Sequence, residues 1–401
     1  TVTLTMLSSQ FNETIPRIEA FMRAHPNIAI DPIEGHTQEQ TNALYWERVT
    51  NNRSVPDLFN VERDKLPQFA AAGVLLDIGA PNVEEKWSKL YADAIWRASH
   101  YAGHLYGLPG DSGQTVMFYR QDIIDRYDLN VPTTWEQFYE EGVKLHRRNP
   151  NRWMGIIDTT DVQHYLSFLR MAHGKPWTVT GTDSISFQLT DPVIQKTARF
   201  IQRCIDDGVL KAEPIWDGRY ALPPDGAFAT FIYANWFGKI LASSYPASAG
   251  KWRVTLPPSF GAPDDVCTAE IGGSVLTISA RTSRKRQRAA LQFAHWFQTN
   301  PESVDLRPLG SFSATRYFQS NPKILSAVDP YFDQRIYAVY VKSANLLNRD
   351  WDNLPFATQL NAAYHDSLVP SLVPGGNSLD VIGQWATELP EYARSQGFTV
   401  E

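Results

Sequence analysis

Residues 55–77 read VPDLFNVERDKLPQFAAAGVLLD, and this stretch decides the fold class. Residues 56–61 (PDLFNV) are predicted to form a strand, and residues 65–72 are predicted to form a helix. Gly73 suits the left-handed position after a helix, and an apolar run follows at residues 74–76. This order of segments indicates an α/β protein.

The alternation of strand and helix extends toward the N-terminus. Residues 2–6 alternate between apolar side chains and threonines, which predicts a strand. A helix is expected to follow, with Thr14 as its cap and Pro16 in its first turn. A second strand at residues 28–33 and a second helix at residues 38–49 complete a doubly wound pattern.

The pattern resumes toward the C-terminus, after a hairpin-like turn at Ala102-Gly103. Strands are predicted at residues 115–119, 153–157, 252–256 and 273–278, and helices at residues 162–172, 192–207, 286–298, 356–368 and 379–389. The proline-rich segment 257–263 cannot form a regular helix or a central strand. Because single cores stop growing at roughly 250–300 residues, the 401-residue chain is expected to form two α/β domains.

Composition excludes several classes of protein. A net charge of −6 argues against a nucleic-acid partner, and the basic run at residues 281–288 is interpreted as the solvated start of a helix. No segment approaches the roughly 20 apolar residues of a membrane span, and residues 1–30 show no signal-peptide pattern, so we expect either a cytosolic protein or a chain that starts after processing. Cys204 and Cys267 either form one bridge or remain two buried thiols.

The short signatures of nucleotide, zinc-protease and serine-hydrolase sites are absent from the sequence. We therefore expect no cofactor, no bound metal and no enzymatic activity. A glycosidase needs only two carboxylates that face each other across a bond, so a glycoside-active enzyme stays as an alternative. The sequence also has 12 tryptophans and 17 tyrosines, whose rings suit both a core and a sugar-binding cleft.

Four blocks of sequence carry a family resemblance. They are VPDLFNVERDKLPQFAAAGVLLD (55–77); GHLYGLP (103–109) with MFYR (117–120) and VPTTWEQF (131–138); ATFIYANW (229–236); and GGSVLTIS (272–279) with the amphipathic helix at 289–297. In order and spacing they resemble the extracellular solute-binding proteins of family 1, the maltose-binding-protein type, which are sugar-binding components of ABC transporters. Arg120 stands where that family commonly has asparagine. Val61 stands where the maltose binder has an aromatic residue, which argues against a maltodextrin ligand.

The resemblance implies a two-lobed periplasmic-binding-protein fold. In it two doubly wound α/β domains are joined by a hinge, with a central ligand cleft. It places residues 1–110 and 262–312 in the N-terminal lobe, and residues 111–261 and 313–401 in the C-terminal lobe. The crossings between the lobes are expected near residues 108–112, 257–263 and 311–315.

The resemblance also implies function. The protein is expected to capture a carbohydrate by hinge closure and to deliver it to the transmembrane permease subunits of an ABC importer. It would act as an exported monomer, periplasmic or membrane-associated outside the cell, whose signal peptide has been cleaved. A polyol or a glycerol phosphodiester is the alternative ligand. A ferric ion is disfavoured because the iron binders of this superfamily typically carry a Tyr-Tyr pair, which is absent here.

Candidate ligand-binding residues come from the loops beside the predicted strands, where open α/β sheets bind ligands, and from aromatic positions. They are Ser9, Gln10, Asp64, Asp111, Ser112, Gln114, Asp161, Gln163, Trp236, Gly272, Gly273, Trp351 and Phe356. Structural alternatives remain open: Asp64 and Asp161 as helix caps, Trp236 as a core residue beneath Phe237, and Gly272 and Gly273 as a bulge. The polar loop residues Ser9, Gln10, Asp111, Ser112 and Gln114 could instead be merely solvated.

Overall fold

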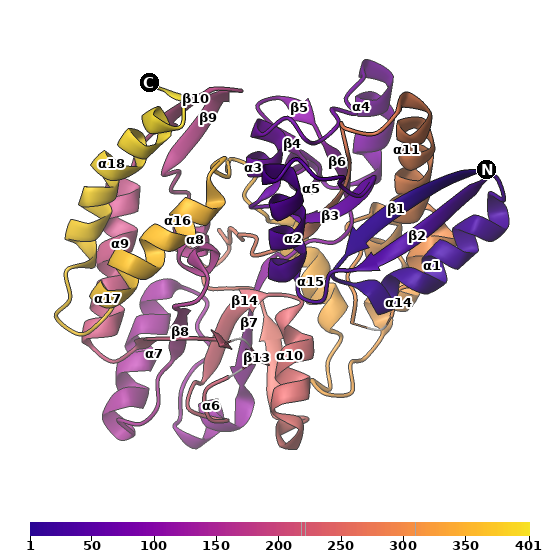
Figure 1. Cartoon of the computed structure of the whole chain (residues 1–401). Coiled ribbons are helices and arrows are strands. Elements are labelled where there is room, and N and C mark those ends of the chain that lie inside the picture. The colour runs from indigo at the N-terminus through magenta and orange to yellow at the C-terminus, as the bar shows by residue number, and fades with distance from the viewer. Residues whose placement is uncertain (218, 221, 309) are drawn as a thin grey trace. The chain divides into compact units, whose positions relative to one another are not determined.

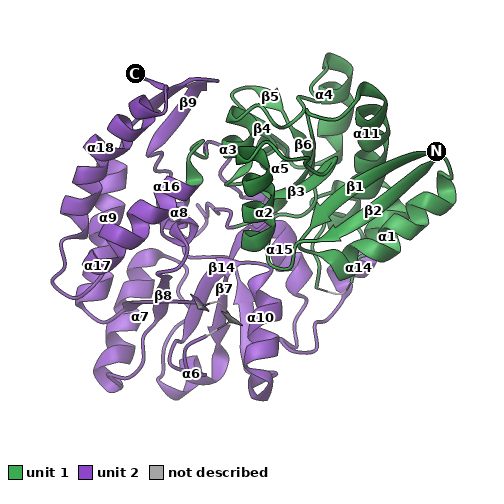
Figure 2. Ribbon diagram, viewed as in Figure 1, with its two compact units in different colours: residues 1–112, 272–321, 353–357 green, residues 113–271, 322–352, 358–401 purple. Residues whose placement is uncertain are grey.

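The computed structural model describes residues 1–217, 219–220, 222–308 and 310–401, and the chain divides into two compact units. Unit 1 contains residues 1–112, 272–321 and 353–357 (green in Figure 2). Unit 2 contains residues 113–271, 322–352 and 358–401 (purple in Figure 2). Both units mix helices and strands, as the sequence predicts.

Unit 1 contains most of the N-terminal elements labelled in Figure 1. Its strands are β1 (Val2–Ser8), β2 (Ile28–Glu34), β3 (Leu58–Glu62), β4 (His100–Tyr101), β5 (His104–Leu105), β6 (Gly107–Pro109) and β16 (Ser274–Ile278). Its helices are α1 (Phe11–Ala24), α2 (Gln38–Thr50), α3 (Leu66–Ala71), α4 (Pro81–Trp87), α5 (Asp93–Arg97), α11 (Arg284–Thr299), α12 (Pro301–Asp305) and α13 (Arg316–Gln319).

The main sheet of unit 1 has the strand order β2-β1-β3-β16-β6. Strands β1, β2 and β3 are parallel, and β16 runs antiparallel to both β3 and β6. The predicted turn at Ala102-Gly103 is confirmed, since it connects the antiparallel pair β4 and β5 and both residues have positive φ angles.

Helices cover both faces of this sheet. Phe59 of β3 stacks on Tyr45 of α2, with the ring centroids 4.0 Å apart. The next residue, Asn60, lines a small cavity together with Arg17 of α1 and Gln298 of α11. Because neighbouring residues of a strand point to opposite faces, α2 lies on one face and α1 and α11 lie on the other. Unit 1 is therefore doubly wound.

Asp57, just before β3, ties together three elements of unit 1. Its carboxylate accepts hydrogen bonds from the Thr5 backbone N–H (2.8 Å), the Thr282 hydroxyl (2.7 Å) and Arg286 Nε (2.8 Å). Burial opposes ionisation of Asp57, but the hydrogen bonds from Arg286, Thr282 and Thr5 lower its pKa. Arg286 belongs to the basic run at 281–288, which is not only solvated, as the sequence predicts, but also anchors the start of α11.

Unit 2 contains the remaining elements. Its strands are β7 (Thr115–Arg120), β8 (Gly155–Asp158), β9 (Trp177–Gly181), β10 (Ser184–Phe187), β11 (Leu210–Glu213), β12 (Trp216–Asp217), β13 (Arg219–Tyr220), β14 (Thr230–Ala234), β15 (Trp252–Thr255) and β17 (Thr399–Val400). Its helices are α6 (Gln121–Arg126), α7 (Trp135–Arg148), α8 (Val162–Met171), α9 (Pro192–Asp206), α10 (Phe237–Ser244), α14 (Pro322–Ser326), α15 (Ile336–Asn345), α16 (Ala357–Ala363, whose first residue belongs to unit 1), α17 (Val369–Ser371) and α18 (Ser378–Ser395).

The sheet of unit 2 repeats the strand pattern of unit 1. Strand β7 lies between β14 and β15 and is antiparallel to both, and β8 pairs in parallel with β11. The Thr230 N–H donates to the carbonyl oxygen of Met154 (2.9 Å), and a parallel bridge joins Trp153 to Phe228, so that β8 continues the sheet beside β14. In each unit, one antiparallel strand is thus inserted among four strands that run parallel to one another.

Two predicted helix boundaries are wrong. The first helix begins at Phe11, and Thr14 lies within it, where its hydroxyl donates to the Gln10 carbonyl (2.7 Å) instead of capping the helix. The last helix, α18, passes through Pro390 and ends at Ser395, although the sequence predicts an end at residue 389. The predicted Asp191 cap is confirmed, because its carboxylate accepts from the Val193 N–H.

The chain passes between the units at one position that the sequence predicts, near residues 108–112, and otherwise at positions that it does not predict. The first passage follows Ser112, but the second follows Ile271, ten residues after the expected boundary at residue 261. The proline-rich segment 257–263 therefore lies within unit 2. Residues 353–357 belong to unit 1, where the Asn353 amide donates to the Arg63 carbonyl (3.3 Å).

Cys204 and Cys267 are both free thiols buried in unit 2, so the unpaired alternative describes this structure. Burial raises the pKa of Cys267 to about 11, and it raises that of Cys204 as well. Among the described residues, no helix is both long enough and apolar enough to cross a membrane.

Candidate functional site

The carboxyl ends of the parallel strands of unit 1 bring seven of the predicted site residues to one edge of its sheet. Strand β1 ends at Ser8, β3 ends at Glu62, and β16 starts opposite Glu62 at Ser274. Strand β6 ends next to the start of β16. The loops at this edge carry Ser9, Gln10, Asp64, Asp111, Ser112, Gly272 and Gly273. In open α/β sheets this is the edge where ligands bind.

Polar side chains connect the first of these loops to α2. The Ser9 hydroxyl donates to Gln38 Oε1 (2.5 Å), and Gln38 Nε2 donates to the Asn60 carbonyl (3.0 Å) and to Asn42 Oδ1 (3.4 Å). Asn42 Nδ2 donates in turn to Glu62 Oε2 (3.0 Å). Sequence reasoning missed Gln38 and Asn42, because both lie in a helix whose relation to the sheet edge depends on packing.

Acidic groups follow β3. Lys65 Nζ lies 2.8 Å from Glu62 Oε2 and 3.1 Å from Asp64 Oδ2. Burial raises the pKa of Glu62, while the charge of Lys65 opposes this shift. Helix α3 begins at Leu66 with no side-chain cap, so the capping alternative for Asp64 is not what the structure shows. The carboxylates here suit the binding of hydroxyl groups.

Asp111 joins the end of β6 to the start of β16. Its Oδ1 atom accepts from both the N–H and the hydroxyl of Ser274, each at 2.6 Å. The Arg63 side chain donates to the Asp111 carbonyl, and the Arg63 N–H donates to the Gly273 carbonyl (3.1 Å). One carboxylate oxygen of Asp111 therefore holds the loop after β6 against the start of β16.

Unit 2 has an equivalent edge. Strand β8 ends at Asp158, β14 ends at Ala234, and β7 starts opposite Ala234 at Thr115. Of the predicted residues, Asp161, Gln163, Gln114 and Trp236 lie next to these strand ends. Asp161 caps α8, since its carboxylate accepts from the Gln163 N–H (2.9 Å), as the structural alternative predicts.

Asp158 is fully buried and organises this edge. Its Oδ1 atom accepts from the N–H (2.8 Å) and the hydroxyl (2.5 Å) of Thr160, and its Oδ2 atom accepts from the Tyr233 hydroxyl (3.0 Å). Burial raises the pKa of Tyr233, and the nearby Asp158 charge adds to the shift. The Tyr233 hydroxyl stays protonated and donates to the carboxylate.

His164 lies beneath this carboxylate. Its Nδ1 atom accepts from the Asp158 N–H (2.9 Å), so its Nε2 atom carries the proton donated to the Ile232 carbonyl (2.9 Å). The ring stacks on Tyr233 at 4.8 Å. Burial lowers the pKa of His164, which favours the neutral ring.

Two half-buried tryptophans lie side by side at this edge. The indole rings of Trp216 and Trp236 have centroids 5.8 Å apart, inclined at 40°. Trp216 Nε1 donates to the Tyr233 hydroxyl (3.1 Å), and Trp236 Nε1 donates to the Ile271 carbonyl (2.9 Å). With both N–H groups bonded, the rings offer apolar surface of the kind that stacks on sugar rings.

Gly113 permits this arrangement. A Cβ atom on Gly113 would lie 2.0 Å from the Ile271 carbonyl oxygen and 3.1 Å from Trp236 Nε1. Any larger residue would displace the backbone that holds Trp236. Sequence reasoning missed both Gly113 and Trp216; Trp216 lies three residues after β11, whose sequence LKAE gives little strand signal.

Three other predicted residues have mainly internal contacts. Gln114 is fully buried, with Nε2 bonded to the Tyr340 carbonyl (2.9 Å). Trp351 lies beside Trp177 and Arg170, near the end of α8 opposite Asp161. Phe356 is 5 % exposed within the segment 353–357 of unit 1.

Comparison with known proteins decides the family. A family model described as bacterial extracellular solute-binding protein matches residues 8–303, which is well over half of the chain. The chain belongs to this family. The resemblance inferred from the four sequence blocks is thereby confirmed.

Relatives of this solute-binding protein include the arabinooligosaccharide-binding protein of Bacillus subtilis (strain 168). It is 22% identical over 327 residues, covering 74% of this chain and 73% of the relative. Among solved structures, the ABC transporter-associated binding protein of B. animalis subsp. lactis Bl-04, in complex with beta-1,6-galactobiose, has a TM-score of 0.83 and 23% identity over the whole of both chains.

The galacto-N-biose-/lacto-N-biose I-binding protein of Bifidobacterium longum, in complex with lacto-N-biose, has a TM-score of 0.81 and 19% identity. That alignment covers 100% of this chain and 99% of the neighbour. These similarities confirm the predicted fold class, an α/β binding-protein fold with two domains, for this solute-binding protein.

Proposed function

We propose that this solute-binding protein captures a carbohydrate for an ABC importer. The observation that carries the proposal is the Trp216–Trp236 pair, which offers apolar rings at the edge of a sheet where carboxylates and amides also gather. The arabinooligosaccharide-binding relative and the two structural neighbours in complex with galactobiose and lacto-N-biose support the same ligand class.

In this proposal the sheet edges of both units contact one ligand. The polar edge of unit 1, with Ser9, Gln10, Asp64 and Asp111, would bond to sugar hydroxyls, and the tryptophans of unit 2 would stack on the sugar ring. A hinge closes the units over the ligand, and the closed form is passed to the transmembrane permease subunits. The protein would act as an exported monomer, periplasmic or attached outside the membrane.

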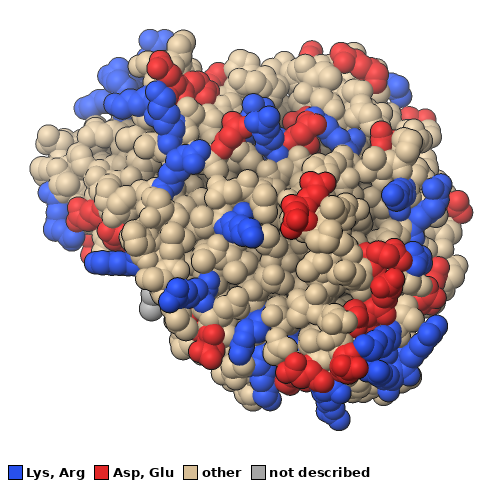
Figure 3. Space-filling view, turned by 180° about the vertical axis from the view of Figure 1, so that it is seen from behind, with Lys and Arg blue, Asp and Glu red and all other residues tan. Residues whose placement is uncertain are grey.

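The surface charge supports a small neutral ligand over a nucleic acid. The net charge is −6, and basic and acidic side chains are interspersed on the face shown in Figure 3. A nucleic-acid surface would instead gather its lysines and arginines.

A thermal-shift screen tests the proposal. The compounds screened are mono- and oligosaccharides, polyols, and glycerol phosphodiesters. A ligand that binds only the folded state raises its stability by about 2.7 kcal/mol at a concentration of 100 times Kd. We expect a saccharide to raise the Tm. Stabilisation by a glycerol phosphodiester or a polyol alone would assign the alternative ligand and reject the carbohydrate.

We also propose that the protein releases its ligand unchanged. Chromatography of the best oligosaccharide after incubation checks this, and we expect no shortened product. Turnover that disappears when one carboxylate is mutated would establish a glycosidase instead.

A further inference from the structure

A buried arginine, Arg17, and a half-buried one, Arg307, lie close together in unit 1. Arg17 of α1 is 3 % exposed, and its Nε atom donates to the Ser303 hydroxyl (3.0 Å). Arg307, just after α12, donates from Nη2 to the Gly110 carbonyl (2.8 Å). The Nη2 atoms of both arginines also donate to the same neutral acceptor, Gln298 Oε1, at 3.4 Å and 3.3 Å.

Neither guanidinium has a carboxylate partner. Among the residues that the structure describes, no carboxylate oxygen lies within 4.0 Å of either side chain. Glu13 and Asp111 act on both arginines only from a longer distance, and Asp111 Oδ1 already accepts two bonds from Ser274. This differs from Arg286, whose buried partner is Asp57.

The positive charge here is therefore poorly compensated. Burial lowers the pKa of Arg17, and repulsion from Arg307 lowers it further; burial also lowers the pKa of Arg307. Buried charges in proteins are usually paired, because an unpaired charge loses its hydration and has no opposite charge nearby to offset that cost.

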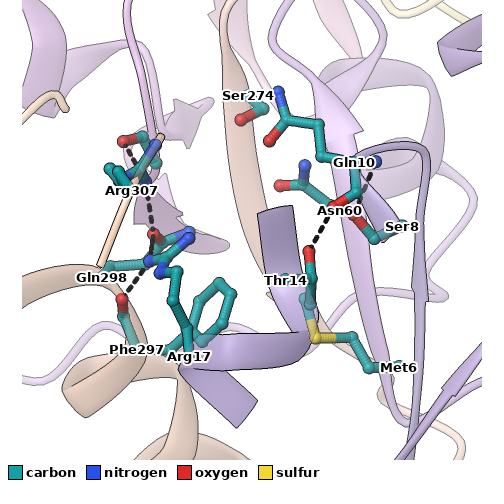
Figure 4. Close-up of a pocket in the computed structure, with 11 residues that line it drawn as sticks. Met6, Ser8, Gln10, Thr14, Arg17, Asn60, Ser274, Phe297, Gln298 and Arg307 are labelled. Atoms are coloured by element: carbon teal, nitrogen blue, oxygen red, sulfur yellow. Dashed lines mark hydrogen bonds between the residues drawn. The ribbon is translucent and has the colours of Figure 1, made fainter. Parts of the chain in front are cut away.

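A small cavity lies against these side chains. Its volume is about 10 Å³, which is close to the space that one water-sized particle needs. In Figure 4, Arg17, Gln298 and Arg307 lie on one side of the cavity, and Gln10, Asn60 and Ser274 lie across from them. The buried Nε atom of Arg307 has no hydrogen-bond acceptor in the described part of the chain.

We propose that this cavity binds a small monovalent anion of the chloride class, held by Arg17 and Arg307. The cavity combines positive charge, an unused N–H donor and room for a single atom. It is too small for phosphate, sulfate or a carboxylate group, and the amides of Gln10 and Gln298 can rotate to present N–H groups to the anion. Because Ser8 and Gln10 also line the cavity, the anion stabilises the loop between β1 and α1.

The test is thermal unfolding of the full chain without sugar, in mixtures of sodium chloride and sodium methanesulfonate at constant ionic strength. Methanesulfonate is too large for the cavity. Above half-saturation, each tenfold rise in chloride should raise the Tm of a unit of this size by about 3–5 °C. Arg307→Gln should abolish this dependence on chloride.

Arg97→Gln is the matched control, because Arg97 is 61% exposed and pairs with Asp93 on the surface of unit 1. It should keep the full chloride response. An equal response in the wild type and in Arg307→Gln would overturn the proposal.

A second measurement does not depend on any variant. In crystals of the wild type soaked in sodium bromide, the anomalous signal should show a peak between the two guanidinium groups. An anomalous map without a peak there would mean that the cavity holds only water, and the anion site would be rejected. Both readouts are independent of the sugar ligand.

Discussion

Trp236 follows the carboxyl end of β14, where its indole lies beside that of Trp216. Trp236→Ala should weaken the binding of the cognate saccharide about tenfold or more. A stacked ring contributes about 0.5–1.5 kcal/mol beyond its buried area, and about 1.4 kcal/mol corresponds to a factor of ten. Titration calorimetry measures the change, with a melting curve of each protein.

The matched control is Trp87→Ala, which removes another half-buried tryptophan, stacked on His295 in unit 1 at 4.4 Å. It should leave the affinity unchanged. If Trp236→Ala binds as tightly as the wild type, the tryptophan is not part of the site; if it melts at room temperature, its role is in the core.

His164 makes the stability of unit 2 depend on pH. Burial lowers the pKa of His164, so just below pH 6.5 this ring is protonated in the unfolded chain but neutral in the folded chain. The free energy of unfolding should therefore fall as the pH drops below about 6.5, by at most about 1.4 kcal/mol per pH unit. Stability from this group is fully present above pH 6.5.

NMR titration of the histidine rings checks the assignment. The His164 ring should stay neutral, with its proton on Nε2, down to a pH well below 6.5, with the 70% exposed His36 as the reference ring in the same spectra. A His164 ring that titrates at or above 6.5 contradicts this explanation.

At the scale of the elements, Asp57 connects β1, β3 and α11 through one carboxylate. Asp57→Asn should reduce the free energy of unfolding by about 1.5–3 kcal/mol, the usual range for hydrogen bonds to a charged group. Denaturant unfolding at pH 7 measures it. The difference from the wild type should vanish in acid, because a lowered carboxyl pKa stabilises the fold above about pH 3.9 and loses this effect as the pH falls through the folded value.

A matched control is Asp93→Asn, whose carboxylate is 52% exposed and pairs with Arg97 across one helical turn. Exposed pairs of this kind are worth only about 0.3–0.5 kcal/mol. If both variants lost the same free energy of unfolding, the hydrogen bonds of Asp57 to the three elements would add nothing to stability beyond an exposed ion pair.

Local signals predicted most elements correctly. Apolar runs gave the strands of unit 1, and the capping of α9 by Asp191 was visible in the sequence. Thr14 was misassigned because a threonine can bond the carbonyl four residues back as readily as it caps a helix. In the sequence Pro390 predicts the end of the last helix, but α18 continues past it to Ser395.

The candidate site was less predictable than the fold. Loop residues such as Asp64 and Asp111 were found, because strand ends define the edge of a sheet. Gln38 and Asn42 were not, since their place at that edge depends on how α2 packs against β3. Residue types alone also cannot separate a cap such as Asp161 from a ligand contact.

At the scale of the whole molecule, the proposed hinge makes a prediction. Small-angle scattering of the protein with saturating saccharide should give a smaller radius of gyration than the free protein, because closure brings the two units together on a timescale of about microseconds to milliseconds. The Trp236→Ala variant at the same sugar concentration is the control. An unchanged radius in the wild type, with binding shown by calorimetry, would reject closure.

The position of β16 has a consequence for how the chain acquires its structure over time. This strand lies between β3 and β6 in the unit 1 sheet, pairing Ile278 with Leu58 and Val275 with Pro109, yet residues 113–271 separate it from both strands in the sequence. A ribosome must therefore complete the long central segment before unit 1 can close its sheet, and such distant pairings form slowly. Until then the edges of β3 and β6 stay unpaired. The N-terminal third of the polypeptide should thus stay accessible to proteases and chaperones until β16 has been made, although it is the first part to be synthesised.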